Sequence, residues 1–265
     1  MNVYKQKLNI KDQVKYLEDK GISFNLFSKS NAEDYLTNNN YYYKLTYFRP
    51  NTNKYSNLDF AYLVDLAIID NYLRSIILEI ALDIEHYSKL KLLHCLENNK
   101  SEDGYSIVKD FMVNQGQNKQ VIEKRIIEKC NNCYVGDIIQ HYDGNYPAWT
   151  LIEIISFGDY LKFYKFCADR WHDKDLLNDF YLMKDVKALR NAAAHNNCIL
   201  NDITIKDSKH KTNHAVKISL KTIKHQRNDK HLSKEKTRQI VTLLYTSIHI
   251  ITSVGVKSKI KNQLI

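Results

Sequence analysis

The stretch from Leu58 to Leu96 constrains the fold of this chain more than any other part of the sequence. Its apolar side chains recur every three or four residues, the spacing of a helix face, over far more than the roughly 11 to 12 residues of an average helix. Charged residues interrupt it, which is unlike a membrane-spanning helix; among them are Asp65, Asp70, Arg74, Glu79, Asp83 and Glu85. We therefore expect one long core helix, or two nearly collinear ones, and no membrane association.

The rest of the chain also favours an all-α fold. Only 7 Gly and 2 Pro occur in 265 residues, too few for a turn-rich β-sandwich, and hydrophobic residues at 44% suffice for a core. Helical spacing predicts further helices over residues 10–17, from about 31, and over 119–130, 148–168, 176–195 and 234–255. We expect Gly21 to end the first helix, Ser30 with Glu33 to form a capping box for the second, and residues 98–118 to be a loop.

The character of the sequence changes after His195. Apolar and polar residues alternate in two runs between Ile199 and Lys221, separated by the charged stretch DSKHKTNH, and a period of two is typical of strands. We expect a basic β-hairpin or arm over residues 201–232. It would follow a helical domain, residues 1–200, and precede a C-terminal helix, residues 233–265, that packs on the bundle.

A cluster of aromatic residues precedes Pro50 and consists of Tyr41, Tyr42, Tyr43, Tyr47 and Phe48. Most of these rings are expected to pack in a core. Lys44 and Arg49 lie among them, and this mixture would also allow the rings to stack on nucleic-acid bases.

The positive charge of the chain is concentrated at its C-terminal end. The net charge is +9, yet residues 201–265 hold 14 basic and 4 acidic side chains, so the first 200 residues are nearly neutral. A solvated surface and an RNA-binding surface both fit this pattern, and next to the motif below the second is favoured. The candidate phosphate contacts are Lys206, Lys209, Lys211, Lys217, Lys221, Lys224, Arg227 and Lys230.

Five cysteines, an odd number, and the absence of a secretory leader favour free thiols and the cytoplasm. Cys130 and Cys133 form a single C-x-x-C pair, whereas a structural zinc site needs four ligands. We expect no metal and no cofactor. The histidines of the basic region, among lysines, are expected to belong to a solvated, polyanion-facing surface.

The segment LRNAAAHN, residues 189–196, carries the residues suited to chemistry. Asn191 and His195 are four apart and share a helix face, so Asn191 could hydrogen-bond the imidazole, whereas Arg190 is five residues from His195, about 140° around the helix. An imidazole can exchange protons near neutral pH and a guanidinium can clamp a phosphate. The set suits metal-free RNA cleavage through the 2′-hydroxyl, giving a 2′,3′-cyclic phosphate.

Two points remain open from the motif alone. One His and one Arg are few for an acid and a base, which suggests that two chains each contribute a motif to a composite site on a two-fold axis. Alternatively, Arg190 is a surface ion-pair partner and His195 a cation at the C-terminal end of a helix dipole.

Four blocks of the sequence resemble those of a known family. They are QVKYLEDKGI (13–22), NNYYYKLTYF (39–48), IIDNYLRSIILEIALDIEHYSK (68–89), and PAWTLIEIISFGDYLKFY (147–164) leading into LRNAAAHNNCILN (189–201). In order and spacing the chain resembles the Abi-like proteins (AbiD/AbiF type) of bacterial abortive infection, whose fold belongs to the HEPN superfamily. The resemblance implies a four-helix HEPN bundle, a homodimer and a toxin-like role in phage defence.

The resemblance also implies residue roles. Arg190, Asn191 and His195 match the superfamily signature of the ribonuclease site, and Glu85 falls where the family has a glutamate that either orients Arg190 or is structural. The chain departs from the family at two places: Cys198 stands where the family often has a basic residue, and Lys89 stands near an arginine expected after Glu85.

We therefore expect an endoribonuclease that has RNA as substrate and a regulatory RNA as a further candidate partner. The alternatives are a non-catalytic RNA-binding protein and a protein-binding member of a toxin–antitoxin pair.

Overall fold

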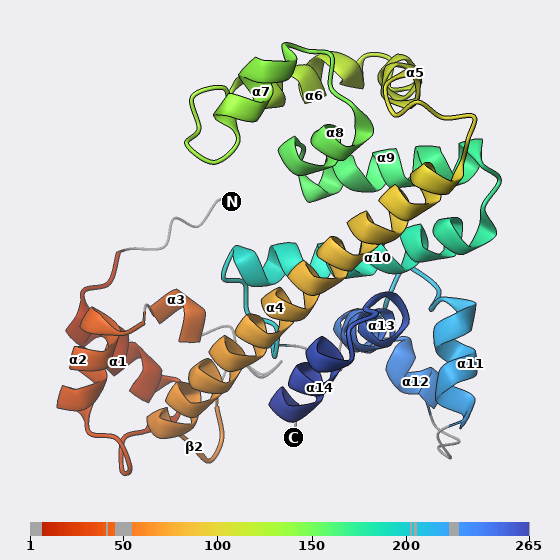
Figure 1. The fold of residues 1–265 in the computed structure, drawn as a ribbon. Coiled ribbons are helices and arrows are strands. Elements are labelled where there is room, and N and C mark those ends of the chain that lie inside the picture. The colour runs from red at the N-terminus through yellow and green to blue at the C-terminus, as the bar shows by residue number, and fades with distance from the viewer. Residues whose placement is uncertain are drawn as a thin grey trace.

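The structure is a computed structural model that describes residues 7–40, 42–45, 55–201, 203, 206–222 and 228–264. Within these residues the chain forms helices and two very short strands, so the all-α prediction is confirmed (Figure 1). The N-terminal half comprises α1 Ile10–Asp19, β1 Ile22–Ser23, α2 Lys29–Asn38, α3 Tyr42–Leu45, β2 Leu58–Asp59, α4 Phe60–Asn98, α5 Ser106–Asn114 and α6 Asn118–Ile127. The C-terminal half comprises α7 Gly136–Tyr142, α8 Ala148–Ile154, α9 Phe157–Arg170, α10 Lys174–Ala194, α11 His214–Thr222, α12 Asn228–Leu232, α13 Glu235–Ile250 and α14 Val254–Gln263.

Helix α4 is the axis of the molecule. It runs unbroken for 39 residues and crosses the whole fold from the N-terminal helices to α9 (Figure 1). The predicted long helix is therefore confirmed as a single element. Its buried positions Ile77, Ile80 and Ile84 belong to the main apolar core, and α10 and α13 pack against α4. No described helix combines the length and the apolarity that a membrane crossing requires.

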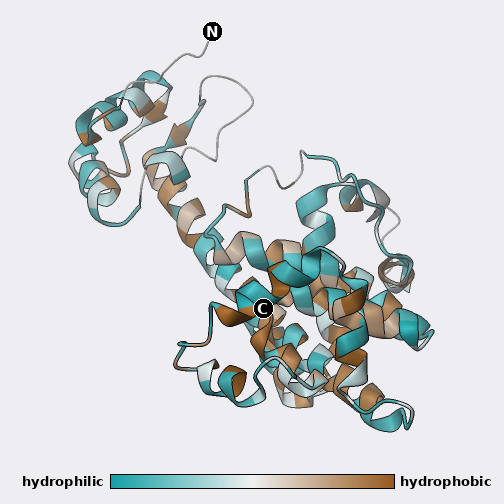
Figure 2. Cartoon of the chain, turned by 90° about the horizontal axis from the view of Figure 1, so that it is seen from above, coloured by the Kyte–Doolittle hydropathy of each residue, from teal (hydrophilic) through white to brown (hydrophobic). Residues whose placement is uncertain are grey.

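The N-terminal helices have a core of their own. We call residues 7–40, 42–45 and 55–59 the N-terminal unit; together with the first turns of α4 it buries Val14, Leu17, Ile22, Ala32, Leu36, Leu45, Tyr55, Phe60, Leu63, Val64 and Ala67. Strands β1 and β2 pair in parallel, and Asp59 joins them by accepting a hydrogen bond from the Ser23 hydroxyl, 2.8 Å. Both views place this unit at one end of α4, away from the larger body (Figures 1 and 2).

Gly21 ends α1 in the manner predicted. It adopts a positive φ of 95°, and a Cβ atom at this position would approach the Tyr55 carbonyl oxygen to 2.4 Å. Glycine is therefore required both by the backbone conformation and by the close approach of the two chain segments.

The larger body is organised around the C-terminal two thirds of α4. Helices α8, α9, α10 and α13 bury a continuous apolar core against it, whose largest members include Phe111, Tyr160, Phe163 and Tyr164. The hydropathy colouring shows apolar segments concentrated where these helices meet and polar segments outside (Figure 2).

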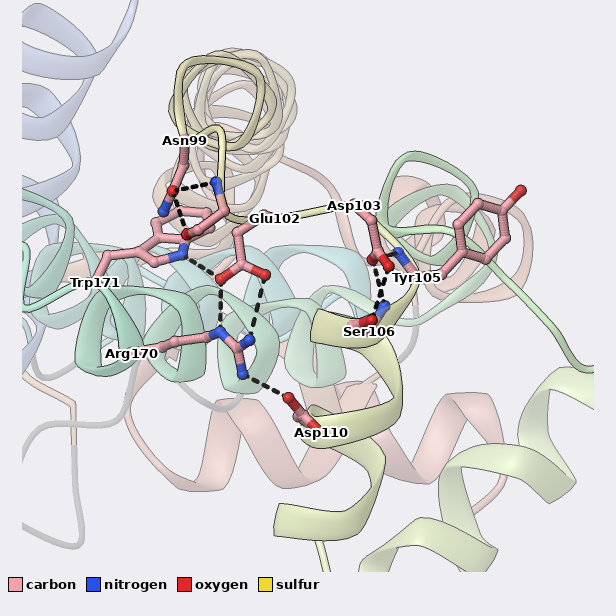
Figure 3. A network of polar contacts seen from close by, with 9 residues as sticks. Asn99, Glu102, Asp103, Tyr105, Ser106, Asp110, Arg170 and Trp171 are labelled. Carbon is pink, nitrogen blue, oxygen red and sulfur yellow. Dashed lines mark hydrogen bonds and ion pairs between the residues drawn. The ribbon is translucent and has the colours of Figure 1, made fainter.

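The segment 98–118 is not the loop that we predicted, because it contains α5. Asp103 accepts hydrogen bonds from the backbone N–H groups of Tyr105 and Ser106, 2.8 and 2.6 Å, and so starts that helix (Figure 3). Beside it, the buried side chain of Glu102 pairs with Arg170, Nε to Oε1 2.6 Å, and accepts from the Trp171 indole at 2.9 Å. These contacts tie the α4–α5 connection to the end of α9.

Three predicted helix limits are wrong for local reasons. The cap of α2 is Ser28, whose side chain accepts from Asn31 N, and not Ser30. The predicted helix 148–168 is two helices, because Ser156 caps a new one. The predicted helix 234–255 likewise ends at Ile250 and is followed by α14, which Ser253 caps. At two of these points a serine, Ser156 or Ser253, caps a new helix inside a stretch whose apolar spacing predicted a single helix.

The predicted basic β-hairpin over 201–232 is wrong where the structure describes this region. Residues 214–222 form α11, and the strand-like contact found here is a single antiparallel bridge between Asp207 and Lys234. Val216 is buried and Leu220, one helical turn later, is half-buried, whereas Ile218 is 50% exposed. Val216 and Leu220 are four residues apart, which also fits one face of a helix, and α11 has helix α13 as its neighbour instead of a second strand.

Candidate active site

Glu85 and Arg190 meet where α4 and α10 pack together. Arg190 Nη2 lies 3.6 Å from Glu85 Oε2, and the side chains are 29% and 17% exposed. The ion pair is therefore half-buried and retains access to solvent. Of the two roles considered for Glu85, this geometry allows it to orient the guanidinium.

Two further groups hold the guanidinium of Arg190. Its Cζ lies 5.6 Å from the centre of the Phe157 ring, a cation–π contact, and its Nη1 donates to Asn191 Oδ1 at 3.1 Å. Phe157 is buried at the first turn of α9 and was not singled out from the sequence. The sequence feature that could have indicated Phe157 is its position directly after Ser156 in one of the family-like blocks. An arginine has five N–H donors, so donors remain for a phosphate.

The carboxyl of Glu85 sits in an unusual environment. Burial raises its pKa above the ordinary value, and the nearby charges of Lys89 and Arg190 oppose this rise without cancelling it. Lys89 Nζ lies 3.9 Å from Glu85 Oε1 and 3.5 Å from Glu153 Oε1. Lys89 therefore contacts the same glutamate as Arg190, a contact that sequence reasoning did not assign.

His195 is the C-cap residue of α10, and its side chain is exposed. Its backbone leaves helical geometry at φ −84° and ψ 13°, and Asn196 follows at φ 57°. The amides of Asn196 and Asn197 bond the carbonyls of Ala193 and Ala192, which is the Schellman pattern of helix termination. The motif therefore ends its own helix at the histidine.

The predicted hydrogen bond between Asn191 and the His195 imidazole is absent from the structure. Asn191 pairs with Arg190 instead, and the imidazole makes no hydrogen bond or ion pair with any residue that the structure describes. Side chains at positions i and i+4 face each other only where the helix continues through both residues, and α10 ends at Ala194, before His195. The structure thus brings Glu85, Arg190 and Asn191 into contact and leaves His195 open beyond them.

The described lysines among the predicted RNA contacts are accessible. Lys206, Lys209, Lys211, Lys221 and Lys230 are exposed and Lys217 is half-buried, and none forms an ion pair with a described residue. Lys224 and Arg227 lie outside the described residues. Four other cations of the C-terminal region are occupied: Lys234 pairs with Asp207, Arg238 with Asp185 and Glu235, Lys259 with Glu79, and Lys236 with two backbone carbonyls.

The two lysines of α11, Lys217 and Lys221, lie away from His195. Asn213, just before α11, donates to Asn178 Oδ1 at 2.9 Å, so α11 begins beside the N-terminal half of α10. Asn178 precedes His195 by 17 residues, which is about 25 Å along a helix. Lys217 and Lys221 therefore lie along the α10 and α13 side of the molecule, at a distance from the motif. The carbonyl of Lys206, in contrast, accepts from Glu235 N, next to the Lys236 that contacts Cys198.

In the described part of the chain no group of three or more His, Cys, Asp and Glu side chains is placed to hold a metal ion. The five cysteines are free thiols, with Cys130 half-buried and Cys133 exposed.

Comparison with known families identifies the class of protein. The family described as Abi-like protein matches residues 34–201, well over half of the chain. The chain therefore belongs to the Abi-like protein family, and this membership indicates a role in abortive infection. The matched range contains Glu85, Arg190, Asn191 and His195 and ends before the basic lysines. Searches among curated proteins and among solved structures found no match.

Proposed function

We propose that this Abi-like protein is a metal-independent endoribonuclease, the toxin of an abortive-infection system. The observation that supports this most directly is the arrangement of Arg190, held by Glu85, Phe157 and Asn191, about one helical turn before the exposed His195. A preorganised guanidinium stabilises the charge that develops on a phosphate during cleavage.

In the proposed reaction the 2′-hydroxyl of the RNA attacks the adjacent phosphorus atom. The imidazole of His195 removes the hydroxyl proton, or supplies a proton to the departing 5′-oxygen, and histidine is suited to both because it exchanges protons near neutral pH. The P–O5′ bond breaks, which leaves a 2′,3′-cyclic phosphate and a 5′-hydroxyl. Arg190 binds the non-bridging oxygens throughout.

A single His195 cannot remove one proton and donate the other in the same step. We propose a homodimer in which two copies of the motif meet on a two-fold axis, so that one histidine serves as base and the other as acid. The exposure of His195 at the end of α10 is compatible with this arrangement, since a buried imidazole could not reach a second chain.

The candidate lysines of the C-terminal region that form no ion pair with a described residue supply the proposed RNA-binding surface. Phosphate contacts by lysine are independent of sequence and weaken with salt. A regulatory RNA bound to the same surface would keep substrate from the site, which is a further part of the proposal.

The test is cleavage of an end-labelled single-stranded RNA in the presence of EDTA. We expect products that end in a 2′,3′-cyclic phosphate. The rate should be at least about 100-fold lower in His195→Ala, the range for loss of a proton-transfer group, and about 100-fold lower in Arg190→Ala, the range for loss of a group that stabilises developing charge. His141→Ala, an exposed histidine on α7, is the matched control and should cleave normally. The active species should have twice the chain mass of 31.2 kDa in sedimentation. Cleavage that EDTA abolishes, or that both substitutions leave intact, would refute the proposal.

A second candidate is a non-catalytic RNA-binding protein. One observation favours it: no described residue orients the imidazole of His195, although catalytic histidines usually have such a partner. In that case RNA would bind in a salt-sensitive manner without being cleaved, and His195→Ala and Arg190→Ala would leave its affinity unchanged.

A further inference from the structure

The segment that follows the motif, residues 196–201, is held by three elements that are distant in sequence. From α4, the carboxylate of Asp70 accepts hydrogen bonds through Oδ1 from the backbone N–H groups of Ile199 and Leu200, at 2.7 and 2.8 Å. Asp70 is fully buried. Because this buried carboxylate accepts hydrogen bonds from two successive backbone N–H groups, it fixes the position of the backbone at Ile199 and Leu200.

The second oxygen of Asp70 is also occupied. Oδ2 pairs with Arg74, one turn along α4, and Arg74 in turn donates to Asn71 Oδ1 at 3.0 Å. Arg74 is also almost wholly buried. Since an isolated buried charge is costly, each member of this cluster depends on the others for its place.

The second element is α3, which belongs to the N-terminal unit. Lys44 Nζ donates to Asn196 Oδ1 at 2.6 Å, and Asn196 is the residue directly after His195. Lys44 is buried, and burial together with the charge of Arg74 lowers its pKa below the ordinary value. From the third element, α13, Lys236 Nζ donates to the carbonyl oxygens of Cys198, at 3.2 Å, and Asn201.

We propose that Asp70 and Lys44 are positioning residues for His195. The imidazole has no described partner of its own, so its location depends on the backbone on either side of it. On one side that backbone is the last turn of α10, and on the other it is the segment held by Asp70 and Lys44. The inference rests on the proposed nuclease function, because it assigns these residues a part in that reaction.

The consequence is that the N-terminal unit contributes to the site. The Lys44–Asn196 contact joins α3 to the residue beside the histidine, 152 positions apart in sequence. A displacement of about 1 Å at a reacting group can lower a rate by about 100-fold, so a contact of this kind acts on turnover more than on substrate binding.

The test compares kcat and KM in three variants. Lys44→Met keeps the length of the side chain and removes its donor, and Asn196→Gly removes the acceptor while retaining a residue that adopts a positive φ without strain. Asp70→Asn removes the buried charge at constant size. We expect kcat to fall about 10- to 100-fold and KM to stay within about twofold. Lys15→Met and Asp65→Asn, the same changes at exposed positions of α1 and α4, should behave as the parent protein.

A readout that needs no activity separates this inference from the proposed function. The NMR signals of the His195 ring, assigned through His195→Gln, should shift in Lys44→Met and Asn196→Gly and not in Lys15→Met. The amides of Ile199 and Leu200 should exchange with deuterium at least about tenfold faster in Asp70→Asn than in Asp65→Asn, because their buried acceptor is weakened. If the parent protein does not cleave RNA, the proposed function fails while these measurements still test the positioning.

Unchanged kcat and unchanged ring signals in both Lys44→Met and Asn196→Gly would overturn the inference. Asn196 is exposed and its turn accepts glycine, so this variant folds even if Asp70→Asn does not.

Discussion

At the scale of single residues, Asp179 is a buried charge that connects four helices of the larger body. It lies on α10 and is completely buried. Its Oδ2 accepts from Lys91 Nζ at 2.6 Å and from the Tyr164 hydroxyl at 3.3 Å, and its Oδ1 lies 3.0 Å from His249 Nε2. One carboxylate thus joins α4, α9 and α13 to α10.

Asp179→Ala should destabilise the protein by about 3 kcal/mol, the order observed when one partner of a buried ion pair is removed. The Tyr164 hydroxyl would also lose its acceptor inside the core. Urea unfolding followed by circular dichroism measures the change. Asp175→Ala, an exposed aspartate in the first turn of the same helix, should cost less than about 1 kcal/mol.

The stability of Asp179→Ala should also depend on pH differently from that of the parent protein. Burial alone would raise the pKa of Asp179, but the hydrogen bonds and charges of His249 and Lys91 hold it below its ordinary value of 3.8. A lowered pKa in the folded state means that the carboxylate stabilises the fold above about pH 3.8 and that this contribution is lost as the pH falls through the folded pKa. The stability difference between parent and Asp179→Ala should therefore narrow below about pH 3.8. A difference that stays constant down to about pH 2 would contradict this account.

At the scale of elements, the break between α8 and α9 illustrates how one side chain divides a helical pattern. Apolar spacing continues from 148 to 168, yet Ile155 and Ser156 are extended and α9 starts anew. The Ser156 hydroxyl accepts from Asp159 N at 3.1 Å and donates to Asp159 Oδ2 at 2.8 Å. This cap places Phe157 in the first turn, where its ring meets Arg190.

Ser156→Ala should lower the free energy of unfolding by about 1 kcal/mol, the usual cost of losing an N-cap. Ser156→Asn, which retains an acceptor, should recover most of that loss. The control is Ser258→Ala, an exposed serine inside α14, for which the change should stay within about 0.5 kcal/mol. Equal effects at both serines would show that the cap contributes nothing.

At the scale of the whole molecule, the basic helix α11 and the motif lie at different parts of α10. In Figure 1, α11 and α12 lie below α10, whereas α5 and α6 lie above it. Among the candidate RNA contacts, the exposed lysines without ion pairs to described residues precede or belong to α11 and α12. RNA bound there would extend along α10 toward His195.

Replacing Lys206, Lys209 and Lys211 together by glutamine should weaken RNA binding and make it less dependent on salt. Each lost phosphate contact lowers the slope of log affinity against log salt by about 0.7 for a single strand, so the slope should fall by about 2. Fluorescence anisotropy, with salt varied from about 50 to about 200 mM, measures this slope. The control replaces Lys109, Lys119 and Lys124 on α5 and α6. An unchanged slope would mean that the basic region is a solvated surface.

The sequence alone determined the helical class, the extent of α4 and the position of the motif. These features follow from local rules: apolar spacing of three to four residues over Leu58–Leu96, and scarce glycine and proline. The family-like blocks also indicated Glu85, Arg190 and His195 before any contact was known.

Only the tertiary structure decided how those residues are connected. Asn191 bonds Arg190 and not His195, Phe157 lies against the guanidinium, and Asp70 reaches amides 129 and 130 positions away. Residues 214–222 form a helix that packs beside α13. These contacts depend on which helix surfaces meet in the folded protein. The periodicity of one segment does not tell which other segment packs against it.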